Sequence, residues 1–186
     1  MPDSKSIHAS PAFAVWLTGL PASGKSTITR ALVARLHGRG VRPAALESDV
    51  LRRVMMPQAG YSDADRDRFY GTMAALGKML VEQGVPVIFD ATANRRRYRD
   101  AARQTIERFI EVWVRTPLAI CQQRDPKGIY SAASPAAGHV PGVSAEYEPP
   151  IGAEVVVEGD RQSPDDAAAA IMAALEERGF VSTLAS

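Results

Sequence analysis

The sequence has a single cysteine, almost no net charge and no long apolar run, and each of these shortages excludes a class of protein. Cys121 alone can form neither an intramolecular disulfide nor a cysteine-rich metal site. A net charge of +1 provides no strong field for long nucleic acids or for a membrane surface. The longest apolar runs are far too short to cross a bilayer, and the N-terminal segment lacks the apolar core of a signal peptide. We therefore expect a cytoplasmic protein without a membrane anchor.

The composition is that of one globular domain, with 46% hydrophobic and 23% charged residues in a chain of 186. We expect this domain at residues 12–180, after a flexible polar arm at 1–11. Short apolar runs predict buried strands at 13–18, 41–46, 85–89, 109–114 and 154–157. Helical patterns and caps predict helices at 25–38, from 49, at 62–84, at 95–108, after 117 and from 163. This alternation predicts a three-layer α/β/α fold with a five-stranded parallel sheet, and the Gly-, Pro-, Ala- and Ser-rich residues 125–150 predict a lid loop.

A glycine-rich segment follows the first predicted strand and opens a helix. It reads Gly19-Leu-Pro-Ala-Ser-Gly24-Lys25-Ser26, which matches G-x-x-x-x-G-K-[ST]. In such a P-loop, backbone N–H groups and a helix N-terminus surround the phosphates, the lysine reaches the β- and γ-phosphates, and the hydroxyl ligates Mg²⁺. The motif predicts a P-loop NTPase-type fold that uses ATP and Mg²⁺, with Lys25 catalytic and Ser26 on the metal. The predicted ATP-binding residues of this segment are Gly19, Pro21, Ala22, Ser23, Gly24, Lys25, Ser26 and Thr27.

Two acidic residues follow other predicted strands. Asp90 ends the third strand, at the edge where parallel sheets bind ligands. We expect it to hold Mg²⁺ through water, although an N-cap of the next helix would also suit an aspartate. Asp49 follows the second strand, with Arg52 three residues later. Asp49 is expected to accept the proton of an acceptor hydroxyl while Arg52 holds an acceptor anion; the alternative is a local ion pair at a helix start.

Basic residues gather in one predicted helix, which contains Arg95, Arg96, Arg97, Arg99 and Arg103. For most of them we expect a solvated helix face, and only Arg95, nearest the strand end, is expected to bind an acceptor anion. Arg66 is a further candidate for that anion. Arg124 and Lys127 open the predicted lid, where cations would shield the transferring phosphoryl group.

Several motifs, in order along residues 13–159, resemble the adenylylsulfate (APS) kinase family. They are the P-loop, Asp49-x-x-Arg52, Tyr61-Ser-x-x-Asp65-Arg66, Pro117-Leu-x-x-Cys121-x-x-Arg124-Asp-Pro-Lys127-Gly-x-Tyr130, Gly142 and Tyr147-Glu148-x-Pro150. The resemblance implies a cytoplasmic, usually dimeric kinase of sulfate assimilation, which phosphorylates the 3′-hydroxyl of adenylylsulfate with ATP and Mg²⁺ to give PAPS. It also implies that Asp49 is the acceptor-side acid and that Arg52 and Arg66 contact the acceptor. Tyr61 would stack on the acceptor's adenine, and Arg124 would lie near the adenine of ATP.

The acceptor side departs from this family pattern, whereas the ATP side keeps it. Phe69 stands where the family usually has an acceptor-binding Asn, Gly71 replaces a usual Arg, and Thr92 falls at the usual Ser of an Ile-Ser-Pro segment. Val140-Pro141-Gly142 replaces Phe-Thr-Gly, so the second stacking aromatic is missing. The segment Asp90-Ala-Thr92-Ala-Asn94 resembles polynucleotide-end kinases and related small kinases. The predicted acceptor-binding residues are Asp49, Arg52, Tyr61, Arg66, Phe69, Thr92 and Arg95.

Three functions are consistent with these residues. The first is APS kinase activity on a small-molecule acceptor. The second is phosphorylation of another hydroxyl, on a different small molecule or on a nucleic-acid end, and the near-neutral charge argues against a long nucleic acid. The third is a nucleotide-binding switch without catalysis. The presence of Lys25, Ser26, Asp49 and Asp90 together argues against the third, because a switch has no need of an acceptor acid.

Overall fold

The computed structural model describes residues 12–58, 60–131 and 138–182. The arm predicted at 1–11 and part of the predicted lid lie outside these ranges. The described residues form one parallel sheet in the order β2-β3-β1-β4-β5. Its strands are β1 (Ala14–Thr18), β2 (Ala44–Glu47), β3 (Val87–Asp90), β4 (Phe109–Arg115) and β5 (Val155–Glu158). The prediction of an α/β fold with a five-stranded parallel sheet is therefore confirmed.

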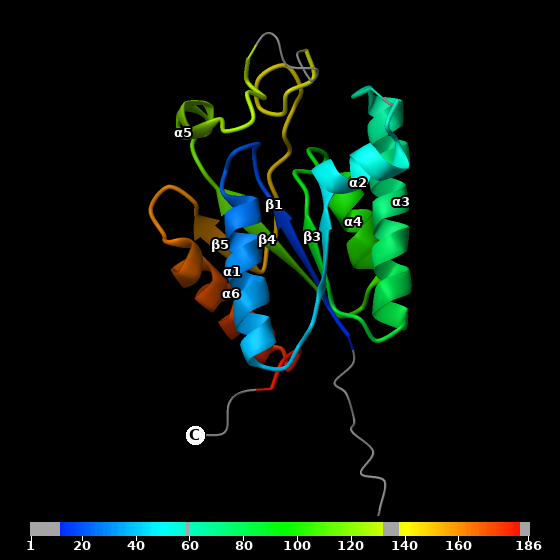
Figure 1. Ribbon diagram of the computed structural model, residues 1–186, viewed down its shortest axis with the longest axis vertical. Coiled ribbons are helices and arrows are strands. Elements are labelled where there is room, and N and C mark those ends of the chain that lie inside the picture. The colour runs from blue at the N-terminus through cyan, green and yellow to red at the C-terminus, as the bar shows by residue number, and fades with distance from the viewer. Residues whose placement is uncertain (1–11, 59, 132–137, 183–186) are drawn as a thin grey trace, which may run out of the picture.

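Helices cover both faces of this sheet (Figure 1). The helices are α1 (Lys25–Gly38), α2 (Ser48–Met55), α3 (Asp63–Glu82), α4 (Arg96–Thr105), α5 (Leu118–Arg124) and α6 (Pro164–Glu177). One layer consists of α1 and α6, and α3 and α4 form the opposite layer, with α2 beside them. None of these helices, in the part of the chain that the structure describes, has the length and apolar character that a membrane span requires.

Strand β1 lies at the centre of the sheet, and its side chains are buried on both faces. Val15 and Leu17 pack into the core under α1 and α6. Ala14 and Trp16 pack into the second core under α3 and α4. All residues of β1 are buried, which is why the sequence shows a continuous apolar run here and no alternation. The segment after β1 therefore begins at the middle of the sheet.

The predicted basic helix at 95–108 is shorter in the structure. Arg95 is the N-cap, with extended backbone angles, and the last helical residue is Thr105. Ile106 leaves the helical region and is 2% exposed, because its side chain fills the core under α3 and α4. By contrast, the predicted Ser62 cap of α3 is present, with the Asp65 N–H donating to Ser62 Oγ at 3.2 Å.

Gly77 in α3 provides a test of how closely this helix packs on the sheet. A Cβ atom at Gly77 would overlap the Phe89 ring, which stacks on Trp16 with ring centroids 4.4 Å apart. We expect Gly77→Ala to lower the free energy of unfolding by about 1–3 kcal/mol, as overpacking does. Gly71→Ala is the matched control in the same helix, because a Cβ atom there has open space. It should raise stability by up to about 1 kcal/mol. Urea denaturation of both variants measures the difference, and equal stabilities would contradict this packing.

Candidate active site

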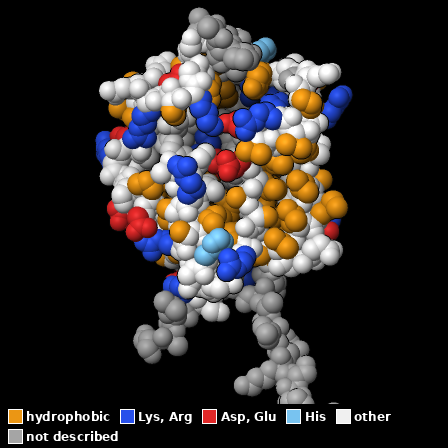
Figure 2. Space-filling view, in the orientation of Figure 1, with side chains coloured by type: hydrophobic (Ala, Val, Ile, Leu, Met, Phe, Trp, Pro, Cys, Tyr) orange, Lys and Arg blue, Asp and Glu red, His pale blue; other side chains and the backbone are white. Residues whose placement is uncertain are grey.

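The predicted functional residues lie at one edge of the sheet, where the parallel strands end. The P-loop follows β1, Asp49 lies in the first turn of α2 after β2, and Asp90 is the last residue of β3. In Figure 1 this edge lies under the segment that follows α5. Figure 2 shows Lys and Arg side chains gathered with acidic ones toward the same end of the molecule. Charged groups from separate parts of the sequence are thus brought to one edge, as parallel sheets bring ligand-binding residues.

The P-loop turns tightly between β1 and α1. Gly24 is the N-cap of α1 with φ of +108°, a backbone conformation that glycine adopts without strain. At Gly19, a Cβ atom would lie 2.5 Å from the carbonyl oxygen of Val114, so a side chain has no room there. Ser23 is fully buried, whereas Ser26 and Thr27 are exposed in the first turn of α1. The predicted ATP-binding segment therefore forms a single turn that ends in a helix N-terminus, the arrangement that binds phosphate groups.

Lys25 lies inside this turn, where carbonyl oxygens hold its ammonium group. Its Nζ donates to the carbonyl oxygens of Gly19 and Leu20, at 3.0 and 2.9 Å. Burial lowers the pKa of Lys25, and the negative charges of Asp90 and then Asp49 oppose that shift. The three residues predicted to be catalytic thus interact electrostatically, although they come from three different strand ends.

Asp90 is 4% exposed, and its Oδ2 has no hydrogen-bond partner among the described residues. The N-cap of the following helix is Arg95, so the alternative that Asp90 caps that helix is wrong. A buried carboxylate oxygen without a donor is costly unless water or a cation satisfies it. This oxygen fits a water-mediated magnesium site.

Asp49 and Arg52 do not pair with each other. Asp49 Oδ2 accepts from Lys127 Nζ of the predicted lid at 2.5 Å. The Arg52 guanidinium lies over two aromatic rings, 4.2 Å from the Phe69 centroid and 5.0 Å from the Tyr61 centroid. The alternative of a local Asp49–Arg52 ion pair is therefore wrong, and Asp49 is instead joined to the lid.

The other basic residues predicted on the acceptor side are engaged by protein groups. Arg66 is 4% exposed and donates to Asn94 Oδ1 at 2.8 Å, to the Tyr61 carbonyl at 3.1 Å and to the His139 carbonyl at 2.5 Å. Arg95 forms ion pairs with Asp63, Glu148 and Glu146 at 3.2, 3.6 and 3.8 Å. Arg52 has no ion pair among the described residues, which leaves its cation available to an acceptor anion.

The remaining predicted residues lie around this edge. Phe69 is fully buried beneath Arg52. The carbonyl oxygen of Thr92 accepts from Thr18 Oγ1 at 2.6 Å, which joins the turn after β3 to the end of β1. Arg124 at the end of α5 is exposed and donates to the Gly159 carbonyl at 2.9 Å.

The lid rests directly on the P-loop. Tyr130 Oη donates to the Pro21 carbonyl at 2.9 Å, and burial raises the pKa of Tyr130. A Cβ atom at Gly142 would lie 2.6 Å from a methyl carbon of Leu20. Sequence reasoning included Tyr130 and Gly142 in a motif without giving either a role. Both positions let the lid approach the nucleotide turn closely.

Sequence reasoning also missed a buried ion pair. The prediction of a solvated helix face is wrong for Arg99, which is 1% exposed and donates from Nε to Glu111 Oε1 at 2.5 Å. The available signal was Glu111, a charged residue with apolar neighbours on both sides in β4, since a buried charge requires a partner.

A family model described as adenylylsulphate kinase matches residues 11–158. The adenylyl-sulfate kinase of Microcystis aeruginosa is 36% identical over 170 residues, which cover 90% of this chain and 93% of that one. The probable adenylyl-sulfate kinase of Bacillus subtilis is 30% identical over 182 residues, 96% of this chain and 92% of that one.

The fold is also similar to a solved structure, that of the Mycobacterium tuberculosis APS kinase CysC in complex with AMPPNP and APS. The TM-score is 0.80 at 30% identity, and the match covers 89% of this chain and 98% of that chain. Since sequence and fold agree along almost the whole length of these relatives, the chain belongs to the adenylylsulphate kinase family.

Proposed function

We propose that this protein transfers the γ-phosphoryl group of ATP to the 3′-hydroxyl group of adenylylsulfate, which gives PAPS and ADP. The observation that carries the proposal is the buried Lys25 ammonium in the P-loop, together with Asp90 and Asp49, the two negative charges that most strongly oppose the lowering of its pKa by burial. A phosphate-binding turn thus lies next to an acid that can serve a hydroxyl group. Family membership and the APS- and AMPPNP-bound relative support the same substrates.

On the nucleotide side, the P-loop backbone would hold the phosphates. The N–H groups at the start of α1 would point at the β-phosphate, and Lys25 would exchange its carbonyl partners for phosphate oxygens. Arg124, exposed at the end of α5, would lie against the adenine. Pre-positioned positive groups stabilise the charge that develops on the transferring group.

The residues present also fit Mg²⁺. Asp90 offers a buried oxygen without a partner, and Ser26 offers an exposed hydroxyl in the first turn of α1. The described residues contain no cluster of three or more His, Cys, Asp or Glu side chains that could hold a metal alone. The ion would therefore be held by Ser26, by Asp90 through water and by the phosphates, and it would neutralise charge on the β- and γ-oxygens.

On the acceptor side, Asp49 would orient the hydroxyl. The hydroxyl oxygen forms a bond to the γ-phosphorus while the bond from that phosphorus to the bridging oxygen of ADP breaks, and the proton passes to Asp49. Because phosphoryl transfer proceeds through a loose transition state, this proton moves late and orientation is the main contribution. Lys127, which pairs with Asp49 in this structure, would shield the negative charge of the transferring phosphoryl group. Arg52 and Tyr61 would hold the acceptor's anion and adenine.

A second candidate is phosphorylation of a different hydroxyl compound. It is favoured by Phe69, which is fully buried beneath Arg52 at a position where an acceptor-binding Asn was expected. The buried Val140 likewise offers no ring for stacking. Both changes concern the acceptor side and leave the phosphoryl-transfer residues unaffected.

An acceptor panel separates the candidates. We expect ADP release to be rapid with adenylylsulfate and slow without an acceptor, with PAPS as the product. The measurement is coupled ADP detection with adenylylsulfate, sugars, other small hydroxyl compounds and a 5′-hydroxyl oligonucleotide. If ADP release occurs only with another compound, that compound is the acceptor and adenylylsulfate is not. Tight ATP binding without any acceptor-dependent release would contradict kinase activity.

The family resemblance further supports a cytoplasmic homodimer whose kinase domain spans residues 12–180, as the sequence predicts. Light scattering of the purified protein tests the dimer, and a monomer mass would contradict it.

A further inference from the structure

We propose that Arg99 is a positioning residue that docks the last part of the lid, residues 146–148, onto the turn that follows Asp90. Residues 146–148 are called the strap below. The docking completes the acceptor side of the active site. The consequence for acceptor binding depends on the proposed function, whereas the docking itself does not.

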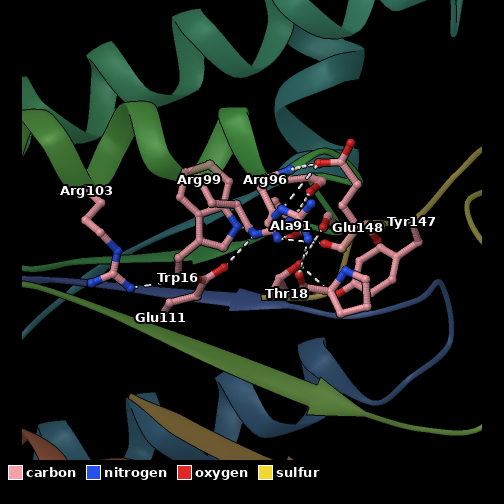
Figure 3. Close-up of polar contacts among 12 residues, drawn as sticks. Trp16, Thr18, Ala91, Arg96, Arg99, Arg103, Glu111, Tyr147 and Glu148 are labelled. Atoms are coloured by element: carbon pink, nitrogen blue, oxygen red, sulfur yellow. Dashed lines mark hydrogen bonds and ion pairs between the residues drawn. The ribbon is translucent and has the colours of Figure 1, made fainter. Parts of the chain in front are cut away.

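Arg99 bonds to three separate parts of the chain (Figure 3). Its Nε donates to Glu111 Oε1 of β4 at 2.5 Å, and its Nη1 donates to the carbonyl oxygen of Ala93 in the turn. Its Nη2 donates to the carbonyl oxygen of Glu148 in the strap at 2.8 Å. One guanidinium group therefore links the sheet, the turn and the strap.

The strap and the turn are held in register by further hydrogen bonds. The Glu148 N–H donates to the Asn94 carbonyl at 2.7 Å, and Asn94 Nδ2 donates to the Glu146 carbonyl at 2.8 Å. Glu148 Oε2 accepts from the Arg96 N–H at 2.8 Å. The Tyr147 hydroxyl lies 3.2 Å from Thr18 Oγ1, at the start of the P-loop. Arg99 bonds to one carbonyl group on each side of this set, those of Ala93 and Glu148, so its loss would remove one hydrogen bond from the turn and one from the strap.

The turn needs such support. Ala93 has φ of +40°, which is unfavourable for a residue with a side chain, and such conformations persist only where the surroundings enforce them. Its N–H donates to Tyr70 Oη at 3.1 Å, and its carbonyl oxygen accepts from Arg99. The turn runs from Asp90 to Arg95 and includes Thr92, so its position affects the predicted metal and acceptor residues together.

A guanidinium group suits this role, and an ammonium group does not. The planar fork of arginine presents N–H donors in fixed directions, so three acceptors can be held at once. Lysine would keep the positive charge opposite Glu111 but would lose the geometry that reaches both carbonyl oxygens. Charge compensation and strap docking can therefore be separated by substitution.

Arg103 provides a matched control on the same helix. It pairs with Glu154 at 2.6 Å and with Glu111 at 3.4 Å, and within the described part of the chain it forms no hydrogen bond to the strap or to the turn. Arg103→Met therefore removes an arginine from the same ion network without touching the docking contacts.

The test compares Arg99→Met, Arg99→Lys, Arg103→Met and the double variant R99M/E111Q in the full chain. The double variant replaces the buried Glu111 carboxylate, which Arg99→Met alone would leave with only the longer ion pair to Arg103 at 3.4 Å. Hydrogen exchange of the strap amides is measured without any substrate, next to exchange of the β1 and β4 amides. The KM values for the acceptor and for ATP are then measured with the acceptor that the panel identifies.

We expect strap exchange to be faster by about tenfold or more in Arg99→Met and in the double variant, because local opening becomes easier while the sheet amides stay protected. Arg99→Lys should recover the thermal stability lost in Arg99→Met, but neither strap protection nor acceptor affinity. The acceptor KM should rise by about tenfold with the ATP KM unchanged, and Arg103→Met should resemble the wild type in both readouts.

The proposal is overturned if the strap stays protected in the double variant, if Arg99→Lys restores its protection, or if Arg103→Met exposes it equally. A uniform rise in exchange across the sheet would also overturn it, because it would show a purely structural ion pair. If adenylylsulfate proves not to be the acceptor, the exchange result still decides the docking.

Discussion

Lys25→Ala is expected to lower kcat by about a thousandfold while the protein stays folded. The Lys25 ammonium is buried in the P-loop, where its hydrogen bonds go to the Gly19 and Leu20 carbonyls. In the reaction the ammonium group would contact the phosphate groups. Alanine would leave no side-chain cation inside the turn to stabilise the negative charge that develops on them. Stability should change little, because burial already disfavours this charge, as the lowered pKa shows.

Steady-state kinetics and a thermal melt of the same preparation test this prediction, because they measure kcat and stability. Lys78→Ala is the matched control, because Lys78 lies on α3 in an exposed ion pair with Glu82 at 2.7 Å. Its kcat should equal that of the wild type. A Lys25→Ala enzyme with wild-type turnover would show that the P-loop does not bind the reacting phosphates.

Much of the fold was predictable because local signals and burial agree. The buried strand β1, the glycine-rich turn and the Ser62 and Ser163 caps each have a local cause in neighbouring residues. Parallel pairing follows, because helices between successive strands return the chain to the same edge. The order of the strands in the sheet depends on tertiary packing and was not predicted.

The partners of the charged side chains were harder to predict, because they are distant in the sequence. Lys127 pairs with Asp49 across 78 residues, and Arg66 reaches the His139 carbonyl across 73. No spacing rule connects such residues. The sequence therefore left an Asp49–Arg52 ion pair open as an alternative and assigned Arg66 to an acceptor anion, whereas in the folded chain Asp49 pairs with Lys127 of the lid and Arg66 donates to Asn94 and to the His139 carbonyl.

Asp49→Asn is expected to lower kcat by about a hundredfold or more, with little change in the affinity for ATP. The amide keeps the shape of the side chain but cannot accept the proton of the acceptor hydroxyl. Affinity for ATP should hold, because the hydrogen bonds that Lys25 forms inside the P-loop do not involve Asp49.

The lid contact must be considered when this variant is interpreted. The hydrogen bond to Asp49 raises the pKa of Lys127, so its loss moves that pKa back toward the ordinary lysine value. An ordinary lysine is still protonated at neutral pH, so Lys127 keeps its charge in the variant. The Asp49–Lys127 pair is also exposed, and such pairs are worth at most about 1 kcal/mol, too little to account for a hundredfold loss. The loss would therefore report the missing carboxylate.

Asp165→Asn is the matched control for Asp49→Asn. Asp165 is also an exposed acid in the first turn of a helix, and it pairs with Arg35 at 2.8 Å. Its removal should leave kcat and the Kd for ATP as in the wild type. Isothermal titration with a non-hydrolysable ATP analogue and steady-state kinetics separate the two effects. If Asp49→Asn weakened the binding of the ATP analogue and left kcat unchanged, Asp49 would act on the nucleotide. The acceptor hydroxyl would then need another base.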